Sequence, residues 1–185
     1  MSYEFEITRR VEFSETDLAG IMHFSNFFRF MESAEHAFFR SLGFSVAECR
    51  YGREVCLPRV HAECDYAVPL RFEDEVRVCL LVERKGRCSL TYQFRFNRVT
   101  DSSTVEVARG RLTVASAARQ PDGSFKAVPL PKGIADQIQQ APPQMLLDAF
   151  PSKANSLGHR NGSRSVRPKP SGPLFSRRNP FLERR

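Results

Sequence analysis

Long apolar runs are missing from this sequence of 185 residues, although 41% of its residues are hydrophobic. No run approaches the roughly 20 residues that a helix needs to cross a bilayer. The first ten residues, MSYEFEITRR, carry acids where a secretory signal would carry bases followed by an apolar stretch. The sequence therefore predicts no membrane span and no Sec export. It favours a cytoplasmic location and one globular domain of ordinary composition.

The sequence also lacks the cysteine pairs that a structural metal site would use. Its five cysteines include no C-x-x-C pair, and no histidine stands at zinc-ligand spacing from them. An odd number of scattered cysteines is typical of free buried thiols in a reducing compartment. No metal or redox cofactor is implied.

Acidic residues are scarce only near the end of the chain. Residues 151–185 carry nine Lys or Arg and a single acid, Glu183, which gives a net charge of +8, whereas residues 1–150 hold a net charge of −1. The basic segment is also rich in Ser, Pro, Gly and Asn and shows no apolar periodicity. The sequence predicts a domain over 1–150 and a disordered basic tail over 151–185.

The domain alternates between two hydrophobic periods. Residues 5–13 show an approximate period of two, which is typical of a strand with one buried face. From Asn26 to Leu42 apolar residues recur every three or four positions, and Gly43 follows where a helix would end. Because its apolar stripe is wide, we expect this helix to lie inside the fold.

Four further segments read as strands joined by short turns, and they are 55–68, 75–84, 88–98 and 104–116. The clearest of them is Cys88–Asn97, in which apolar and polar residues alternate strictly. Short connections make neighbouring strands antiparallel. The sequence thus predicts an α+β fold, with a long central helix wrapped by a curved antiparallel sheet of about five strands. After Ala118 the strand pattern fades, and only a weak helical stretch follows at 134–140.

The connection between the first strand and the helix contains the most informative residues. Asp17 lies a few residues before the predicted helix N-terminus. The unpaired N–H groups of a first helical turn suit a carbonyl oxygen that is becoming an oxyanion, and a nearby carboxylate can attack that carbonyl or activate water. This arrangement is a plausible acyl-hydrolysis site. On these grounds alone, an isolated Asp before a helix is more often a turn or capping residue.

The stretch ETDLAGIMHFSNFFRFME resembles the signature of the hydroxybenzoyl-CoA thioesterase family of hotdog-fold enzymes. In that signature, T-D-x-x-G precedes a short turn, an Asn and an aromatic-rich helix. Residues 64–78 (CDYAVPLRFEDEVRV) resemble the next strand pair of the family, and residues 82–96 its following hairpin. The resemblance covers about residues 5–116 and implies a hotdog fold, which agrees with the fold expected from the periodicity.

The resemblance also implies roles for individual residues. Asp17 falls on the catalytic carboxylate, acting as nucleophile or general base, and Gly20 falls on the glycine of the turn. The backbone N–H of Phe24 would polarise the thioester carbonyl. Asn26 would hold the loop and the helix start together by hydrogen bonds. His23 would either orient Asp17 and the attacking water or merely line the pocket.

Other charged residues have two interpretations each. Glu32 and Glu35 lie on the helix, where another branch of hotdog thioesterases carries its catalytic carboxylate. Because Asp17 already fills the position of the first branch, a structural or pocket-lining role is favoured for Glu32. Arg84, Lys85 and Arg87 fall where relatives place basic groups against the phosphates of CoA, although a basic turn is usually just solvated.

These features together predict an acyl-CoA thioesterase that converts an aromatic or fatty acyl-CoA to free acid and CoA. The resemblance implies a homodimer or homotetramer, in which sheets join edge to edge. Two alternatives stay open: a hotdog protein that binds acyl thioesters without turnover, and a nucleic-acid-associated protein that binds weakly through the basic tail. The tail contains no recognisable nucleic-acid-reading module.

Overall fold

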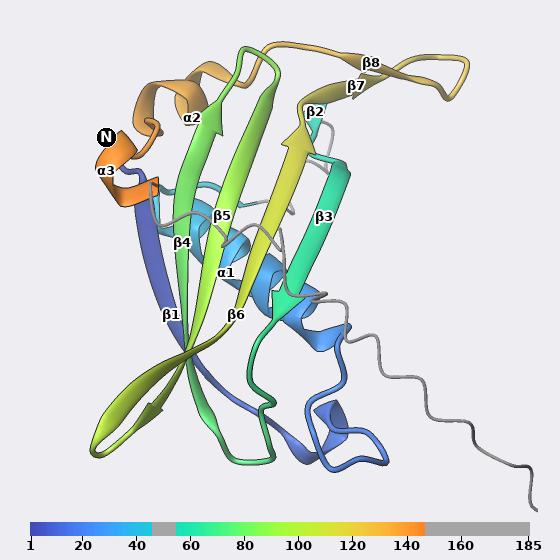
Figure 1. Ribbon diagram of the computed structural model, residues 1–185. Coiled ribbons are helices and arrows are strands. Elements are labelled where there is room, and N and C mark those ends of the chain that lie inside the picture. The colour runs from blue at the N-terminus through green and yellow to red at the C-terminus, as the bar shows by residue number, and fades with distance from the viewer. Residues whose placement is uncertain (46–54, 147–185) are drawn as a thin grey trace, which may run out of the picture. The chain divides into compact units, whose positions relative to one another are not determined.

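Five antiparallel strands and one long helix form the centre of the fold (Figure 1). The structure, a computed structural model, describes residues 1–45 and 55–146. Its elements are β1 (Glu4–Arg10), a 3₁₀ turn (Phe13–Glu15), α1 (Asn26–Ser41), β2 (Val55–Cys56), β3 (Arg59–Tyr66), β4 (Glu75–Lys85), β5 (Ser89–Thr100), β6 (Ser103–Ala115), β7 (Ala117–Arg119), β8 (Phe125–Ala127), α2 (Lys132–Gln137) and α3 (Pro143–Leu146). The predicted α+β hotdog fold is confirmed, because the predicted strands and helix all appear near their expected places. The tail predicted over 151–185 lies outside the described residues, so its disorder and its weak nucleic-acid binding stay predictions.

The main sheet has the strand order β1-β4-β5-β6-β3. All four neighbouring pairs are antiparallel, and the β4–β5 and β5–β6 pairs are the hairpins expected from the short turns. In this order the two edge strands are β1 and β3. The register places Val78 opposite Phe96 and Leu80 opposite Phe94, so these large apolar side chains share one face of the sheet.

That shared face is the core of the protein. Alternation along β4 and β5 buries one side of each strand, as the period of two requires, and Leu81 and Gln93 are buried on the other side as well. Phe94 and Phe96 are fully buried, and removing a side chain of this size from water contributes about 2–3 kcal/mol to folding. The predicted inward-facing residues of β5 are therefore confirmed.

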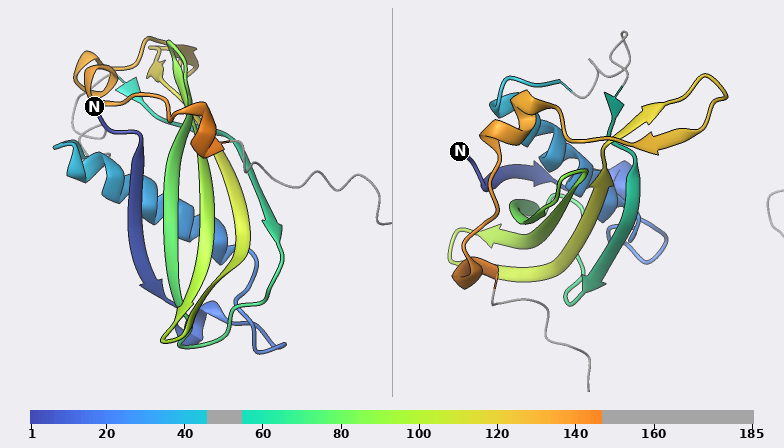
Figure 2. Two further views of the ribbon diagram at one scale, coloured as in Figure 1. Left: turned by 60° about the vertical axis from the view of Figure 1, so that its left-hand side comes forward. Right: turned by 90° about the horizontal axis from the view of Figure 1, so that it is seen from above.

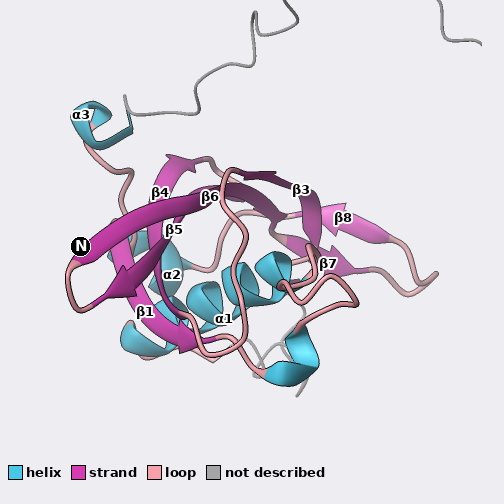
Figure 3. Ribbon diagram, turned by 60° about the horizontal axis from the view of Figure 1, so that its bottom comes forward, coloured by secondary structure: helices cyan, strands magenta, loops and turns pink. Residues whose placement is uncertain are grey.

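Helix α1 lies along the concave face of the sheet (Figures 2 and 3). Its core-facing side chains are buried, and they are Phe27, Phe30, Met31, Ala34, Phe38 and Phe39. Arg29 and Arg40 on the opposite side are exposed. The curved sheet thus encloses the helix from one side, as expected of a long helix packed against a single curved sheet (Figure 2). An open sheet of five strands curves part of the way and stops at its two edges.

The end of α1 follows from the glycine that the sequence places there. Gly43 has φ of 81°, a left-handed conformation that costs glycine little. Its N–H donates to the Arg40 carbonyl at 3.0 Å, and the Phe44 N–H donates to the Phe39 carbonyl at 2.9 Å. These two bonds are the Schellman pattern that satisfies the last carbonyls of a helix. The predicted helix stop is confirmed.

The chain beyond Ala118 holds more structure than its sequence pattern indicated. β7 and β8 form a short antiparallel hairpin, and β7 also pairs with β2. The segment after α2 then crosses the outer face of the main sheet, where the Ala141 N–H donates to the Val82 carbonyl at 2.8 Å. Gln93 faces outward from β5 but is only 1% exposed. The alternation of apolar and polar residues did not predict this burial on the polar side of the strand.

The four cysteines in the described ranges are free, as expected, but they are half-buried rather than buried. Cys56, Cys64 and Cys79 lie on strands, and Cys88 lies in the turn before β5. Cys79 on the outer face donates to a Glu6 carboxylate oxygen at 3.1 Å. Burial first, and then this carboxylate, raises the pKa of the Cys79 thiol to about 12. Of the described helices, none has the length and apolar character needed to span a membrane.

Gly110 on β6 allows close contact between helix and sheet. A methyl group at this position would overlap the Met31 side chain, with the Met31 methyl carbon at 3.0 Å. Gly110→Ala should therefore lower the free energy of unfolding by about 1–3 kcal/mol, measured by urea denaturation. The loss should shrink when Met31→Ala is combined with it, because the shortened side chain leaves room. A Gly110→Ala protein as stable as wild type would contradict this close packing.

Candidate active site

The loop that carries Asp17 is closed by backbone hydrogen bonds. Thr16 and Met22 form an antiparallel bridge, and the Asp17 N–H donates to the Ile21 carbonyl at 2.9 Å. The Gly20 N–H returns to the Asp17 carbonyl at 2.9 Å. Gly20 has φ of 70°, a conformation in which a side chain would be strained. The expected role of Gly20 in shaping the turn is thus what its backbone geometry requires.

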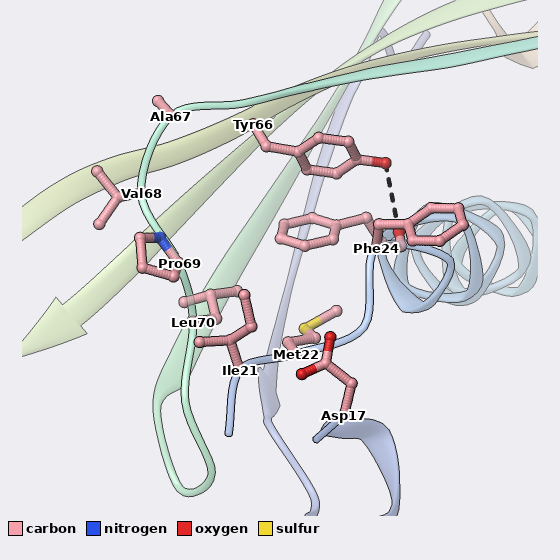
Figure 4. A pocket seen from close by; sticks show the side chains of 10 residues that line it. Asp17, Ile21, Met22, Phe24, Tyr66, Ala67, Val68, Pro69 and Leu70 are labelled. Carbon is pink, nitrogen blue, oxygen red and sulfur yellow. Dashed lines mark hydrogen bonds between the residues drawn. The ribbon is translucent and has the colours of Figure 1, made fainter. Parts of the chain in front are cut away.

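The Asp17 carboxylate is half engaged and half available. One oxygen accepts the Ala19 N–H at 2.8 Å, a local bond that fixes the side-chain direction. Among residues 1–45 and 55–146, no partner contacts the other oxygen. The Asp17 carboxylate lies at a cavity that this residue helps to line (Figure 4). Asp17 is therefore held in place while one oxygen remains open to chemistry.

The cavity has a volume of about 530 Å³ and apolar walls. Asp17 is the single charged side chain among its lining residues. The others are Ile21, Met22, Phe24, Phe27, Tyr66, Ala67, Val68, Pro69 and Leu70. A cavity of this kind accommodates an apolar group and leaves the carboxylate as its reactive feature.

The backbone of Phe24 supplies a hydrogen-bond donor beside this cavity. The preceding carbonyl, that of His23, accepts the Asn26 N–H at 2.9 Å and so points toward the first turn of α1. Because the C=O and N–H of a trans peptide point in opposite directions, the Phe24 N–H points away from that turn. It meets no acceptor in the described part of the chain. A free N–H at a helix start can stabilise a developing oxyanion.

Asn26 ties the loop to the helix. Its side chain is 6% exposed, and its amide nitrogen donates to the Glu15 carbonyl at 2.7 Å. The same carbonyl accepts the His23 N–H at 2.9 Å. One carbonyl of the loop therefore binds two groups at the helix start. These are the hydrogen bonds expected of Asn26.

His23 contacts its own neighbours rather than the carboxylate. Its Nδ1 lies 2.8 Å from the Ser25 hydroxyl, and its ring centroid lies 4.4 Å from that of Phe24. It is absent from the residues that line the cavity. In the described chain, the contacts of His23 lie at the helix start. The side chain makes no contact there with Asp17 and does not line the cavity, so its expected roles stay predictions.

Comparison of the sequence with family profiles assigns this chain to a known family. The profile of the Thioesterase-like superfamily matches residues 11–138, which include the loop, α1 and every strand of the main sheet except β1. The chain belongs to this superfamily. Its membership confirms the family resemblance, since that resemblance rested on the same loop and helix.

Individual proteins that are similar to this chain carry thioesterase, hydrolase or esterase names. A putative esterase of Aquifex aeolicus is 42% identical over 91 residues, which is 49% of this chain and 70% of the relative. A 1,4-dihydroxy-2-naphthoyl-CoA hydrolase of Prochlorococcus marinus is 30% identical over 140 residues, covering 69% of this chain and 83% of the relative. The crystal structure of a Synechocystis 1,4-dihydroxy-2-naphthoyl-CoA thioesterase matches with a TM-score of 0.65 at 23% identity, over 71% of this chain and 93% of that one. This last match supports the fold.

The two carboxylates on α1, those of Glu32 and Glu35, form ion pairs with an arginine of β3. Arg59 on β3 donates to Glu35 at 2.7 Å and pairs with Glu32 at 3.1 Å. Neither carboxylate lines the cavity that holds Asp17. The structural role favoured for Glu32 therefore agrees with its contacts.

The predicted CoA-binding cations lie far from the cavity in this chain. Arg84, Lys85 and Arg87 surround the β4–β5 turn, whereas the loop between β1 and α1, which carries Asp17, lies at the other end of the sheet (Figure 1). An eleven-residue strand such as β4 is about 36 Å long. Lys85 also donates to the Ala135 carbonyl and, at 2.8 Å, to the Ile138 carbonyl, so it holds the end of α2. Within one chain these residues do not form a site with Asp17.

The opposite wall of the cavity was not predicted. It is formed by Tyr66 and by the segment 67–70 that follows β3. These residues lie in the stretch that resembles the family strand pair, but their types are ordinary for a strand and turn. They reach the loop only because β3 pairs with β6 and because the segment after β3 passes next to Met22. The Met22 N–H donates to the Leu70 carbonyl at 2.8 Å.

The buried Glu35 predicts a pH-dependent stability. It is 2% exposed, and its Oε1 has no hydrogen-bond partner in the described structure. Burial raises the pKa of Glu35 from 4.5 to about 7, although the Arg59 guanidinium acts in the opposite direction. Between these two pH values the folded state binds more protons than the unfolded state, so the free energy of unfolding should fall as pH rises through this window.

Glu35→Gln should remove this component. The difference between the wild-type and variant unfolding free energies, measured by denaturation from pH 4 to pH 8, should change by up to about 3 kcal/mol, because one pKa unit corresponds to about 1.4 kcal/mol. Taking the difference cancels other titrating groups such as His36, whose pKa burial lowers. Two parallel profiles would show that Glu35 ionises normally.

Proposed function

We propose that this protein hydrolyses the thioester bond of an apolar acyl-CoA, with Asp17 as its catalytic carboxylate and the Phe24 N–H as its oxyanion donor. The observation that carries the proposal is that Asp17 and Phe24 both line one apolar cavity of about 530 Å³. Membership of the Thioesterase-like superfamily supports the reaction class. The relatives named 1,4-dihydroxy-2-naphthoyl-CoA hydrolase support a CoA thioester as substrate.

The chemistry needs only the groups already described. The thioester carbonyl oxygen would accept the Phe24 N–H, which makes the carbonyl carbon electrophilic. Asp17 would then attack this carbon, forming an acyl anhydride that water cleaves, or it would take a proton from the water that attacks. In either route the C–S bond breaks and the CoA thiolate leaves and takes up a proton. One oxyanion donor of this kind contributes about 3–4 kcal/mol to transition-state stabilisation.

The lining favours an apolar acyl group. Aromatic rings of Phe24, Phe27 and Tyr66 border the cavity, and aliphatic side chains complete the wall. Such a surface stabilises a planar aromatic or a short hydrocarbon group by burial and offers little to a charged one. Comparing kcat/KM for benzoyl, phenylacetyl, naphthoyl and straight-chain CoA thioesters would identify the preferred group.

Asp17→Asn tests the assignment of the carboxylate. Asparagine keeps the shape and the local hydrogen bond but cannot act as nucleophile or base. Release of CoA thiol, followed with a thiol reagent, should fall by roughly 100- to 10,000-fold, while the melting temperature stays near that of wild type. Glu32→Gln is the matched control, since it neutralises a carboxylate outside the cavity and should retain activity.

Two results would contradict the proposal. An Asp17→Asn protein with wild-type turnover would remove Asp17 from the mechanism, and loss of activity in Glu32→Gln alone would transfer the role to the helix. Binding of acyl-CoA without hydrolysis by the wild-type protein would instead favour a carrier or sensor of acyl thioesters.

The open edge of the sheet supports assembly into at least a dimer. Seven of the eight side chains of β3 are exposed, and its outer edge has no partner strand in the described chain. An open edge of this kind favours pairing with the same strand of a second copy. Such pairing would also bring a second chain toward the exposed Asp17.

Val60, which is 61% exposed on β3, offers a test of this assembly. Val60→Lys should shift the mass measured by light scattering from that of a dimer to that of a monomer at micromolar concentration. Val105→Lys, at an exposed position on β6, is the matched control and should leave the mass unchanged. A monomeric wild-type protein would refute the assembly but not the reaction.

A further inference from the structure

The Tyr66 hydroxyl makes a hydrogen bond across the mouth of the cavity. It donates to the Phe24 carbonyl at 3.3 Å, as the dashed line in Figure 4 shows. Tyr66 ends β3, whereas Phe24 begins the approach to α1. This bond therefore links the edge strand of the sheet to the residue whose N–H borders the cavity.

Local hydrogen bonds hold the Phe24 carbonyl only weakly, so the bond from Tyr66 matters for its position. The N-cap residue Ser25 makes no side-chain capping bond. The Phe24 carbonyl accepts one long backbone bond, from the Phe27 N–H at 3.3 Å. A carbonyl oxygen has two lone pairs, and the Tyr66 hydroxyl occupies the second. The peptide that follows Phe24 is thus held from outside the helix.

The position of the hydroxyl is fixed by the core. The Tyr66 ring packs edge-on against Phe27 with centroids 5.0 Å apart, and Phe27 packs in the same way against Phe96 at 5.1 Å. Phe96 is fully buried on β5. The three rings form a continuous path from the sheet to the cavity mouth, so the hydroxyl sits on a rigid support.

We propose that Tyr66 is a positioning residue, which fixes the Phe24 backbone so that its N–H meets the developing oxyanion. The two peptides that flank Phe24 are then held by different partners: the first by the bond from the Asn26 N–H to the His23 carbonyl at 2.9 Å, and the second by Tyr66. With both peptide planes fixed, the direction of the Phe24 N–H is fixed as well. The inference rests on the proposed function, because it assigns the oxyanion role to the same N–H.

The hydroxyl is a stable donor over the working range of a hydrolase. Partial burial, and then the neighbouring Cys64, raises the pKa of Tyr66 to about 12. Tyr66 thus stays protonated at neutral pH and takes no part in proton transfer. Its removal should change the rate without changing the pH profile of kcat.

Tyr66→Phe is the decisive variant, because it keeps the ring contact with Phe27 and removes only the hydroxyl. We expect kcat to fall about three- to tenfold, the range of one neutral hydrogen bond, while KM stays within about twofold of wild type. Tyr3→Phe is the matched control, since Tyr3 lies outside the cavity lining, and it should leave both constants unchanged. Tyr66→Leu, which also removes the ring, should raise KM as well.

A second measurement does not depend on turnover. Backbone NMR of Tyr66→Phe should shift the Phe24 carbonyl carbon and the Ser25 amide, which belong to the peptide that loses its partner. The same signals should not move in Tyr3→Phe.

The outcomes separate the two proposals. Unchanged kcat, or a rise in KM alone, would overturn the positioning role while leaving acyl-CoA hydrolysis in place. If the wild-type protein hydrolyses no acyl-CoA thioester, the proposed function fails, and the oxyanion part of this inference fails with it. Unmoved Phe24 and Ser25 signals would overturn the hydrogen bond itself.

Discussion

The burial of α1 against the concave face of the sheet is the constraint on which the rest of the structure depends. Its apolar face fixes the helix axis, and Gly110 lets the sheet backbone approach Met31 closely. The N-terminus of α1 then lies at one end of the sheet, next to the segments that follow β1 and β3. A site made of three separate segments can be stable here because the core holds all of them.

The backbone of the Asp17 loop is held in place by contacts with the helix start and with the segment after β3. The Glu15 carbonyl binds both the Asn26 side chain and the His23 N–H, and Met22 is bonded to Leu70 across the cavity floor. These bonds fix the backbone on both sides of Asp17. In the proposed reaction, a carboxylate with one engaged oxygen and one free oxygen would need little reorganisation, which is the condition under which preorganised charge is most effective.

The sequence predicted those features that depend on local pattern. Alternation on β5 and the helical spacing before Gly43 are local, and both were recovered. The resemblance pointed to Asp17, Gly20 and Asn26, because these residues lie in one continuous motif, and their roles in catalysis stay predictions. Features that depend on distant contacts were missed: Gln93 is 1% exposed on the polar side of β5, and Tyr66 meets Phe24 only after β3 pairs with β6. The bases of the β4–β5 turn failed to join Asp17 in this chain because strand length separates them.

The exposure of the site connects its chemistry to assembly. A hydrogen bond to a developing oxyanion is stronger when water is excluded, yet Phe24 is 59% exposed and Tyr66 is 45% exposed in one chain. The acyl group would cover the apolar wall from within, but it cannot cover the outer side of these rings. The strand that ends at Tyr66 is also the strand whose edge is open. Under the proposed assembly, pairing at β3 would therefore exclude water from the same residues that hold the Phe24 peptide, and the open edge would then contribute to the proposed site.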